Sequence, residues 1–106
     1  MFFAVDRDLR SHGYGSEILR ILQKLYPTKT MIVSIEHSDT DRDGDQERRK
    51  RFYLRNGFTE TGYLIRMKGV DQEILVRNGH FSKAKFRAFL ALYSNGTLWP
   101  KIRKFE

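Results

Sequence analysis

Hydrophobic residues in the first third of the chain form two short runs, and between these runs they recur at helical spacing. The first run, Phe2 to Val5, is apolar and aromatic, which predicts a buried strand. Apolar residues then recur at i, i+4, i+7, i+8 and i+11, which predicts one helix face that ends before Pro27: Tyr14, Ile18, Ile21, Leu22 and Leu25. Residues 30–36 are rich in β-branched side chains and predict a second strand. A strand, a helix and a strand in so short a span predict an α/β fold with a parallel strand pair.

A second helix is expected after a polar loop over residues 37–45. The predicted helix runs from Gln46 to Asn56, with Asp45 as its N-cap and Gly57 as its C-terminal stop. The loop before it contains Asp39-x-Asp41-x-Asp43-Gly44, which matches the first half of an EF-hand calcium loop. The twelfth position of that loop requires a bidentate Glu and is Lys50 here, so we interpret the loop as a solvated acidic turn.

The remaining residues predict a hairpin and a third helix. Phe58 to Met67 and Glu73 to Arg77 predict two strands joined through Gly69. Ser82 is expected to cap the helix, and its apolar face is expected to contain Phe86, Phe89, Leu90 and Tyr93. The breaks expected before and after this helix are Asn78-Gly79 and Asn95-Gly96, and residues 97–106 are expected to form a basic tail.

Composition restricts the class of protein further. The chain has 106 residues, of which 40% are hydrophobic and 13% aromatic, which predicts one folded domain or part of one. It has no cysteine, so disulfides and thiolate metal sites are excluded, and we expect a cytoplasmic location. No apolar run reaches transmembrane length, and no signal peptide is expected. The net charge of +7 predicts an anionic partner, either a phosphorylated cofactor or nucleic acid.

The turn between the first predicted strand and the first predicted helix has the features of an anion site. It contains Arg10-Ser11-His12-Gly13-Tyr14-Gly15-Ser16, in which two glycines allow close approach of the backbone to a ligand. The N–H groups of a first helical turn have no internal partners, and the helix dipole favours an anion there. An ordinary strand-to-helix connection is the alternative. The turn is neither a dinucleotide fingerprint, because Ile18 stands where a third glycine would fall, nor a P-loop.

Two motifs together resemble the GNAT N-acetyltransferase superfamily. The first is Val-x-x-x-x-Arg-x-x-Gly-x-Gly, from Val5 to Gly15, and the second is Phe-Tyr-x-x-x-Gly-Phe, from Phe52 to Phe58. The order, the spacing and the predicted element types agree with that family. The resemblance covers residues 2–77 and implies an acyl-CoA N-acyltransferase fold, a mixed sheet with flanking helices. Residues 1–77 would be the C-terminal part of the acetyltransferase domain, and residues 78–106 a helix and basic tail that pack on it.

The resemblance implies a role for each matching position. Backbone groups near Ala4 and Val5 would pair with the pantetheine arm of acetyl-CoA. The cofactor's pyrophosphate would be held by the turn residues Arg10, Ser11, His12, Gly13, Tyr14, Gly15 and Ser16. Tyr53 would be the general acid that protonates the departing CoA thiolate, and a pKa near 10 suits a tyrosine for that transfer. The alternative for Tyr53 is a packed aromatic, which is also our interpretation of Phe52 and Phe58.

The sequence departs from the family in several places. An Asn that is often found before the tyrosine is either replaced by Gln46 or displaced by the acidic loop. Arg49 replaces a small residue that lies close to the cofactor in the family. We expect this chain to lack the strands and helices that precede the pyrophosphate-loop strand in the family, and with them the usual acceptor contacts. Glu36 and His37 are weak candidates for the general base, and a surface role is expected for both. We interpret the run Arg48-Arg49-Lys50-Arg51 as a solvated face, with contacts to the CoA phosphates as the alternative.

The function expected from these observations is transfer of an acetyl group from acetyl-CoA to an unidentified primary amine. Direct attack by the amine is expected because no Cys is present to form a thioester with the enzyme. The alternatives are a non-catalytic acyl-CoA-binding module and a basic nucleic-acid-binding domain. No metal and no membrane partner are expected. The open, apolar first strand predicts self-association, most simply as a homodimer, and incomplete activity of the chain alone.

Overall fold

The structure is a computed structural model that describes residues 2–6, 15–37, 44–67, 69–93 and 101–104. Its helices are α2 (Gly15–Leu25), α3 (Asp45–Arg55) and α4 (Lys83–Tyr93). Its strands are β1 (Phe2–Val5), β2 (Met31–Glu36), β3 (Thr59–Met67), β4 (Val70–Arg77) and β5 (Lys101–Lys104). None of the helices in these ranges has the length and apolar character that a membrane-spanning helix needs.

The strands form one mixed sheet in the order β1-β2-β4-β3-β5. The only parallel pair among them is β1 with β2, in the register Phe2 to Met31 and Val5 to Ser34. The three other neighbouring pairs are antiparallel, and β3 and β4 form a hairpin through Gly69, whose φ is +78°. The predicted α/β fold with a mixed sheet and a parallel strand pair connected by a helix is therefore confirmed.

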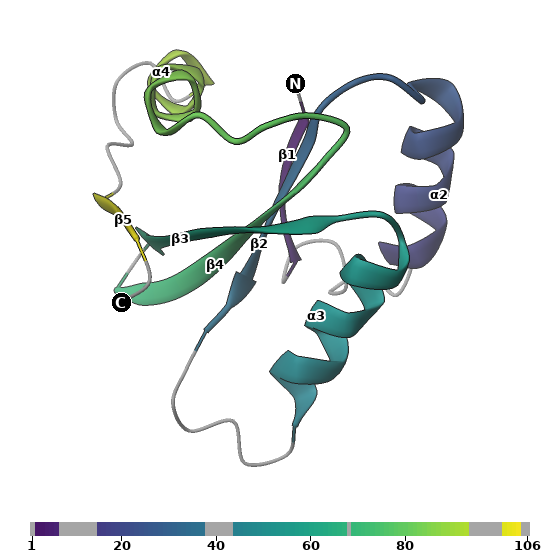
Figure 1. The fold of residues 1–106 in the computed structure, drawn as a ribbon, viewed down its shortest axis with the longest axis horizontal. Coiled ribbons are helices and arrows are strands. Elements are labelled where there is room, and N and C mark those ends of the chain that lie inside the picture. The colour runs from purple at the N-terminus through teal and green to yellow at the C-terminus, as the bar shows by residue number, and fades with distance from the viewer. Residues whose placement is uncertain (1, 7–14, 38–43, 68, 94–100, 105–106) are drawn as a thin grey trace.

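Helices cover both faces of the sheet, with α2 and α3 on one face and α4 on the other (Figure 1). Period-2 alternation along each strand divides the apolar residues between two cores. The core beneath α2 and α3 contains Leu19, Met31, Val33, Ile35, Tyr53, Phe58 and Leu75. The core beneath α4 contains Ile32, Ile65, Ile74, Val76, Phe86 and Ile102. The sheet therefore separates two cores that share no residue.

Two sequence predictions about packing need correction. β1 is a half-buried edge strand instead of a buried one, since Phe3, Ala4 and Val5 keep part of their surface exposed. The buried side of α2 is turned away from the predicted face, because Leu19 is buried whereas Ile21 and Leu25 are 56% and 63% exposed.

Two helix ends lie where the sequence predicts them, and a third differs. Ser82 Oγ accepts a hydrogen bond from the Lys85 N–H at 3.3 Å, so Ser82 caps α4 as predicted. Gly57, with φ +90°, follows the C-cap of α3 and ends that helix as predicted. The N-cap of α3 is Gly44 instead of Asp45, and Asp45 pairs with Arg48 within the first turn.

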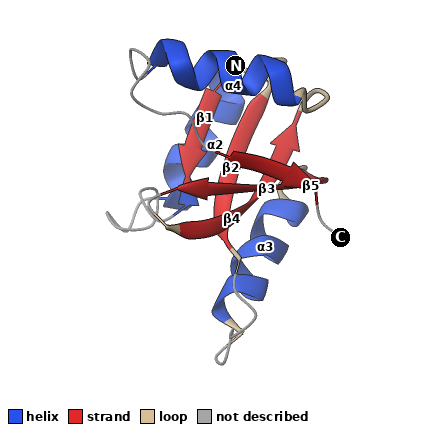
Figure 2. Cartoon of the chain, turned by 90° about the vertical axis from the view of Figure 1, so that its left-hand side faces the viewer, coloured by secondary structure: helices blue, strands red, loops and turns tan. Residues whose placement is uncertain are grey.

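Part of the C-terminal segment that was predicted to be a basic tail forms a strand, β5. The sequence predicts no element after the third helix, yet β5 pairs antiparallel with β3 and aligns Ile102 with Ile65. Ile102 is 5% exposed and belongs to the core beneath α4. Residues 94–100 lie outside the described residues, as do the side chains of Leu90 and Tyr93. Figure 2 shows α4 crossing the end of the sheet at which β1 begins.

Candidate functional site

Tyr53 and Asp6 join the two motifs at the carboxyl end of β1. Asp6 directly follows β1, and Tyr53 lies on the sheet-facing side of α3. The Tyr53 hydroxyl donates a hydrogen bond of 2.6 Å to Asp6 Oδ1, and both residues are buried. Arg49, one helical turn before Tyr53, places its Nε 2.9 Å from Asp6 Oδ2. The buried carboxylate of Asp6 is therefore held by a phenol and a guanidinium, as a buried charge requires.

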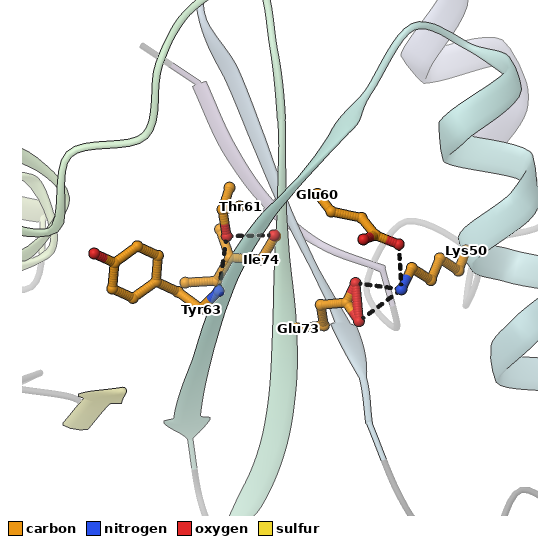
Figure 3. A network of polar contacts seen from close by, with 6 residues as sticks. All are labelled: Lys50, Glu60, Thr61, Tyr63, Glu73 and Ile74. Atoms are coloured by element: carbon orange, nitrogen blue, oxygen red, sulfur yellow. Dashed lines mark hydrogen bonds and ion pairs between the residues drawn. The ribbon is translucent and has the colours of Figure 1, made fainter. Parts of the chain in front are cut away.

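A second ionic group lies beside the first on the same face of the sheet. Lys50 Nζ is 2.8 Å from Glu73 Oε2 and 2.7 Å from Glu60 Oε1, as Figure 3 shows. The side chain of Glu73 is 3% exposed, and Lys50 provides the cation that pairs with this buried carboxylate. Burial alone lowers the pKa of Lys50, but hydrogen bonds and charge attraction from Glu60 and Glu73 outweigh it and raise that pKa above its ordinary value. Lys50 therefore stays protonated and cannot act as a neutral base near pH 7.

A bulge in β3 brings Glu60 to this group. The register between β3 and β4 shifts between Glu60, which faces Leu75, and Leu64, which faces Glu73. Thr61 Oγ1 donates to the Ile74 carbonyl at 2.8 Å and accepts from the Tyr63 N–H at 3.2 Å, which satisfies backbone groups that the ladder leaves out (Figure 3). The bulge thus allows Glu60 and Glu73 to flank one lysine from two neighbouring strands.

A pocket of about 200 Å³ opens between the end of β2 and the first turns of α3. Its lining residues are Ile35, Glu36, His37, Gln46, Glu47, Lys50 and Glu73. Glu36 and His37, for which the sequence predicts a surface role, are half-buried in this wall. The pocket therefore combines carboxylates and an imidazole, which are groups that can bind an amine or accept a proton from it.

The strand edge next to this pocket is only partly paired. The ladder between β1 and β2 ends with Val5 and Ser34, whereas β2 continues to Glu36. Ile35 and Glu36 pair with β4 on one side, and among the described residues no strand is in register with them on the other. Within the described residues, the β1–β2 ladder thus stops one residue before the buried Asp6.

The predicted cofactor-binding residues are described only in part. Ala4 and Val5 lie in β1, where their register partners on β2 are Val33 and Ser34. Gly15 and Ser16 form the start of α2, so its N-terminus follows the predicted turn. The other predicted positions, Arg10, Ser11, His12, Gly13 and Tyr14, lie outside the described residues. So does most of the acidic loop (residues 38–43), and the described residues contain no group of three metal-binding side chains.

The interpretation of residues 48–51 as a solvated face is wrong for half of that run. The side chains of Arg48 and Arg51 are 66% and 64% exposed, but those of Arg49 and Lys50 are 20% and 28% exposed. Arg49 and Lys50 face the sheet because they pair there with the buried carboxylates of Asp6 and Glu73. Neither acid is among the residues predicted from the sequence, although an acid directly after the apolar run 2–5 and another inside the apolar strand 70–77 are visible signals.

A larger pocket of about 460 Å³ lies at the β3–β4 hairpin and extends to His37 and β5. Arg103 Nη2 lies 2.8 Å from Asp71 Oδ2, and Arg66 Nη1 lies 3.6 Å from Asp71 Oδ1. Two guanidiniums thus share one carboxylate and leave one positive charge uncompensated within this group. No role for these residues is predicted from the sequence.

Comparisons of the chain with protein-family models, with curated proteins and with solved structures found no match.

Proposed function

We propose that the chain binds acetyl-CoA at the carboxyl ends of β1 and β2 and is the C-terminal part of a GNAT-type N-acetyltransferase. The turn from Arg10 to Ser16 would hold the pyrophosphate, and a primary amine would accept the acetyl group. This proposal rests on the sequence resemblance together with the geometry at the end of β1.

The observation that carries the proposal is the 2.6 Å hydrogen bond between Tyr53 and Asp6. The resemblance assigns one cofactor to two motifs that lie far apart in sequence. A residue of the second motif touches the residue from which the pyrophosphate turn departs, so both can reach one ligand. The parallel pair β1–β2 supports the proposal as well, because the crossover helix of such a unit directs its N-terminus to the carboxyl end of the first strand, where anions bind.

The proposed reaction needs one proton acceptor and one proton donor. The amine nitrogen attacks the thioester carbonyl, a C–N bond forms, the C–S bond breaks, and CoA leaves as a thiolate. The Tyr53 hydroxyl supplies a proton to that sulfur by rotating about its C–O bond away from Asp6. Glu36 and His37 line the neighbouring pocket and are the candidates to accept the amine proton. Tyr53 is only 2% exposed, so this role requires a cofactor that reaches the end of the sheet beside Asp6.

A non-catalytic acyl-CoA-binding module is the second candidate function. The observation that favours it is the engagement of Tyr53 itself, because its hydroxyl already satisfies the buried carboxylate of Asp6. In that case the phenol stabilises the fold, and the turn binds the cofactor without transferring its acetyl group.

Thermal denaturation with ligands tests the binding step. CoA and ADP should raise the melting temperature, whereas pantetheine, which lacks the pyrophosphate, should raise it much less. Gly13→Val should abolish the shift caused by CoA, because a β-branched side chain blocks close approach of the backbone. Gly62→Val is the control, since this glycine lies in β3 and has a positive φ of +77°. A parent chain that responds to a single-stranded oligonucleotide and not to CoA would refute the proposal.

Release of the CoA thiol from acetyl-CoA in the presence of primary amines tests the chemical step. Tyr53→Phe should lower turnover by roughly 10²–10⁴-fold while the thermal shift with CoA persists. Binding of CoA by the parent without any amine-dependent thiol release would establish the non-catalytic module instead.

A further inference from the structure

Among the described residues, β1 is an edge strand that carries no charged residue, proline or bulge, although it is only four residues long. β1 is the first strand of the sheet order, and no other described strand lies along its outer side. Proteins commonly protect such an edge by keeping the strand short or by placing charged residues, a proline or a bulge in it. The four residues of β1 are Phe2, Phe3, Ala4 and Val5, and its ladder to β2 is regular throughout. This edge is therefore suited to pair with another strand.

Helix α2 exposes apolar side chains on the side of this edge. Leu19 and Leu22 pack on the sheet, and Gln23 Nε2 donates to the Asn56 carbonyl at the end of α3, at 3.3 Å. Ile21 and Leu25 are each two residues from Gln23, which is about 200° around a helix. They therefore project from the flank opposite α3. Because α3 reaches β3 and β4 through Lys50, that opposite flank of α2 faces the β1 side of the sheet (Figure 2).

Charges beside these side chains are arranged to complement a second helix that runs antiparallel. Glu17 lies in the first turn of α2 and Lys24 in the last, on either side of Ile21 along the chain. Both are exposed and stand three or four residues from Ile21, so they border the same flank. Two copies of α2 that cross antiparallel at Ile21 would bring Glu17 of each copy toward Lys24 of the other. Such self-complementarity is the requirement for a two-fold interface.

We propose that the β1–α2 surface, made of the outer edge of β1 with Ile18, Ile21 and Leu25 of α2, binds a second copy of the chain. The two-fold axis is perpendicular to the sheet, so the β1 strands pair antiparallel and the two sheets become one. This symmetry keeps each α2 on the same face as its counterpart and brings the two apolar stripes together. The inference is independent of the proposed acetyltransferase function.

Sedimentation equilibrium of the full chain over a wide range of concentrations tests the interface. The parent should be a dimer, and Ile21→Glu with Leu25→Glu should weaken association by at least about hundredfold, because two apolar side chains per copy lose their buried environment. Leu54→Glu is the matched control. Leu54 is 39% exposed on α3 and does not belong to the β1–α2 surface, so this variant should associate as the parent does.

A charge exchange separates this two-fold arrangement from any other contact. Glu17→Lys should weaken the dimer, since it places like charges together twice, and the double variant Glu17→Lys with Lys24→Glu should restore it. Circular dichroism and melting temperature confirm that each variant is folded. A monomeric parent at the highest concentrations, a dimer that survives the Ile21 and Leu25 substitutions, or a double variant no better than Glu17→Lys would each overturn the proposal.

Discussion

At the scale of single residues, the central feature is the placement of two consecutive cations over two buried acids. Arg49 pairs with Asp6, and Lys50 pairs with Glu73 and Glu60. Each pair crosses from α3 to the sheet, so the ionic groups fix the helix over the strands. Breaking such a pair by removing one partner is destabilising because it leaves a buried charge without compensation.

Lys50→Met should lower the free energy of unfolding by about 1–3 kcal/mol at neutral pH, because Glu73 loses its cation. The pKa of Lys50 is raised above its ordinary value of 10.5 in the folded chain. A raised pKa contributes stability below the unfolded pKa, and this contribution is lost as the pH rises through the folded pKa. The difference in unfolding free energy between parent and variant should therefore shrink above about pH 10.5. Urea denaturation of the parent and of the variant at a series of pH values measures this difference in the free energy of unfolding.

Arg51→Met is the control for this prediction. Arg51 pairs with Glu47 on the exposed side of the same helix, four residues away. Such a pair contributes about 0.3–0.5 kcal/mol. An Arg51 variant that loses as much stability as the Lys50 variant would show that burial of Glu73 does not matter.

At the scale of elements, the end of α3 illustrates what glycine does where the chain turns. Gly57 has φ +90°, and a Cβ at this position would lie 3.0 Å from Arg77 Nε. That nitrogen donates to the Asn56 carbonyl at 3.1 Å, so the turn and the neighbouring strand are joined there. Gly62 has a similar φ of +77°, but a Cβ there would meet no atom within 4 Å.

Gly57→Ala and Gly62→Ala should therefore differ in cost. Each forces a side chain into a left-handed conformation, which costs roughly 1–2 kcal/mol. Gly57→Ala in addition requires Arg77 Nε to shift by a few tenths of an ångström, and loss of its hydrogen bond to the Asn56 carbonyl would add on the order of 1 kcal/mol. Melting temperatures of the two variants measure the difference. Equal destabilisation would mean that Arg77 moves aside without loss.

Most elements could be predicted from the sequence, and the failures have physical causes. The period of the apolar residues identified β1, α2, β2, α3 and the β3–β4 hairpin, because these segments are patterned locally. β5 was missed because Lys101–Lys104 offers a single apolar residue, Ile102, and becomes a strand only through the edge of β3. The face of α2 was predicted incorrectly because apolar residues surround more of that helix than the sheet covers.

Less of the candidate site than of the fold could be predicted from the sequence. Tyr53 could be singled out by its motif. Its partner Asp6 lies 47 residues away in the sequence, and no local sequence pattern indicates that the two side chains are in contact. The charged run on α3 has the composition of a solvated surface, and only the buried positions of Asp6 and Glu73 show which of its members turn inward.

At the scale of the whole molecule, the sheet acts as a partition between two cores that draw on different parts of the chain. The core beneath α2 and α3 uses residues up to Leu75, whereas the core beneath α4 adds Phe86 and Ile102 from the C-terminal part. Phe86 is fully buried there, with Phe3 and Phe81 at centroid distances of 5.1 and 5.4 Å.

This division implies that the two sides of the protein need not open together. Loss of α4 and β5 would uncover one face of the sheet, yet Leu19, Tyr53 and Phe58 would remain packed on the other. Amide hydrogen exchange should then resolve two units of different local stability. The amides of α4 and β5 should exchange first, whereas those of β2 and β4, which lie between the two cores, should exchange only when the whole chain unfolds.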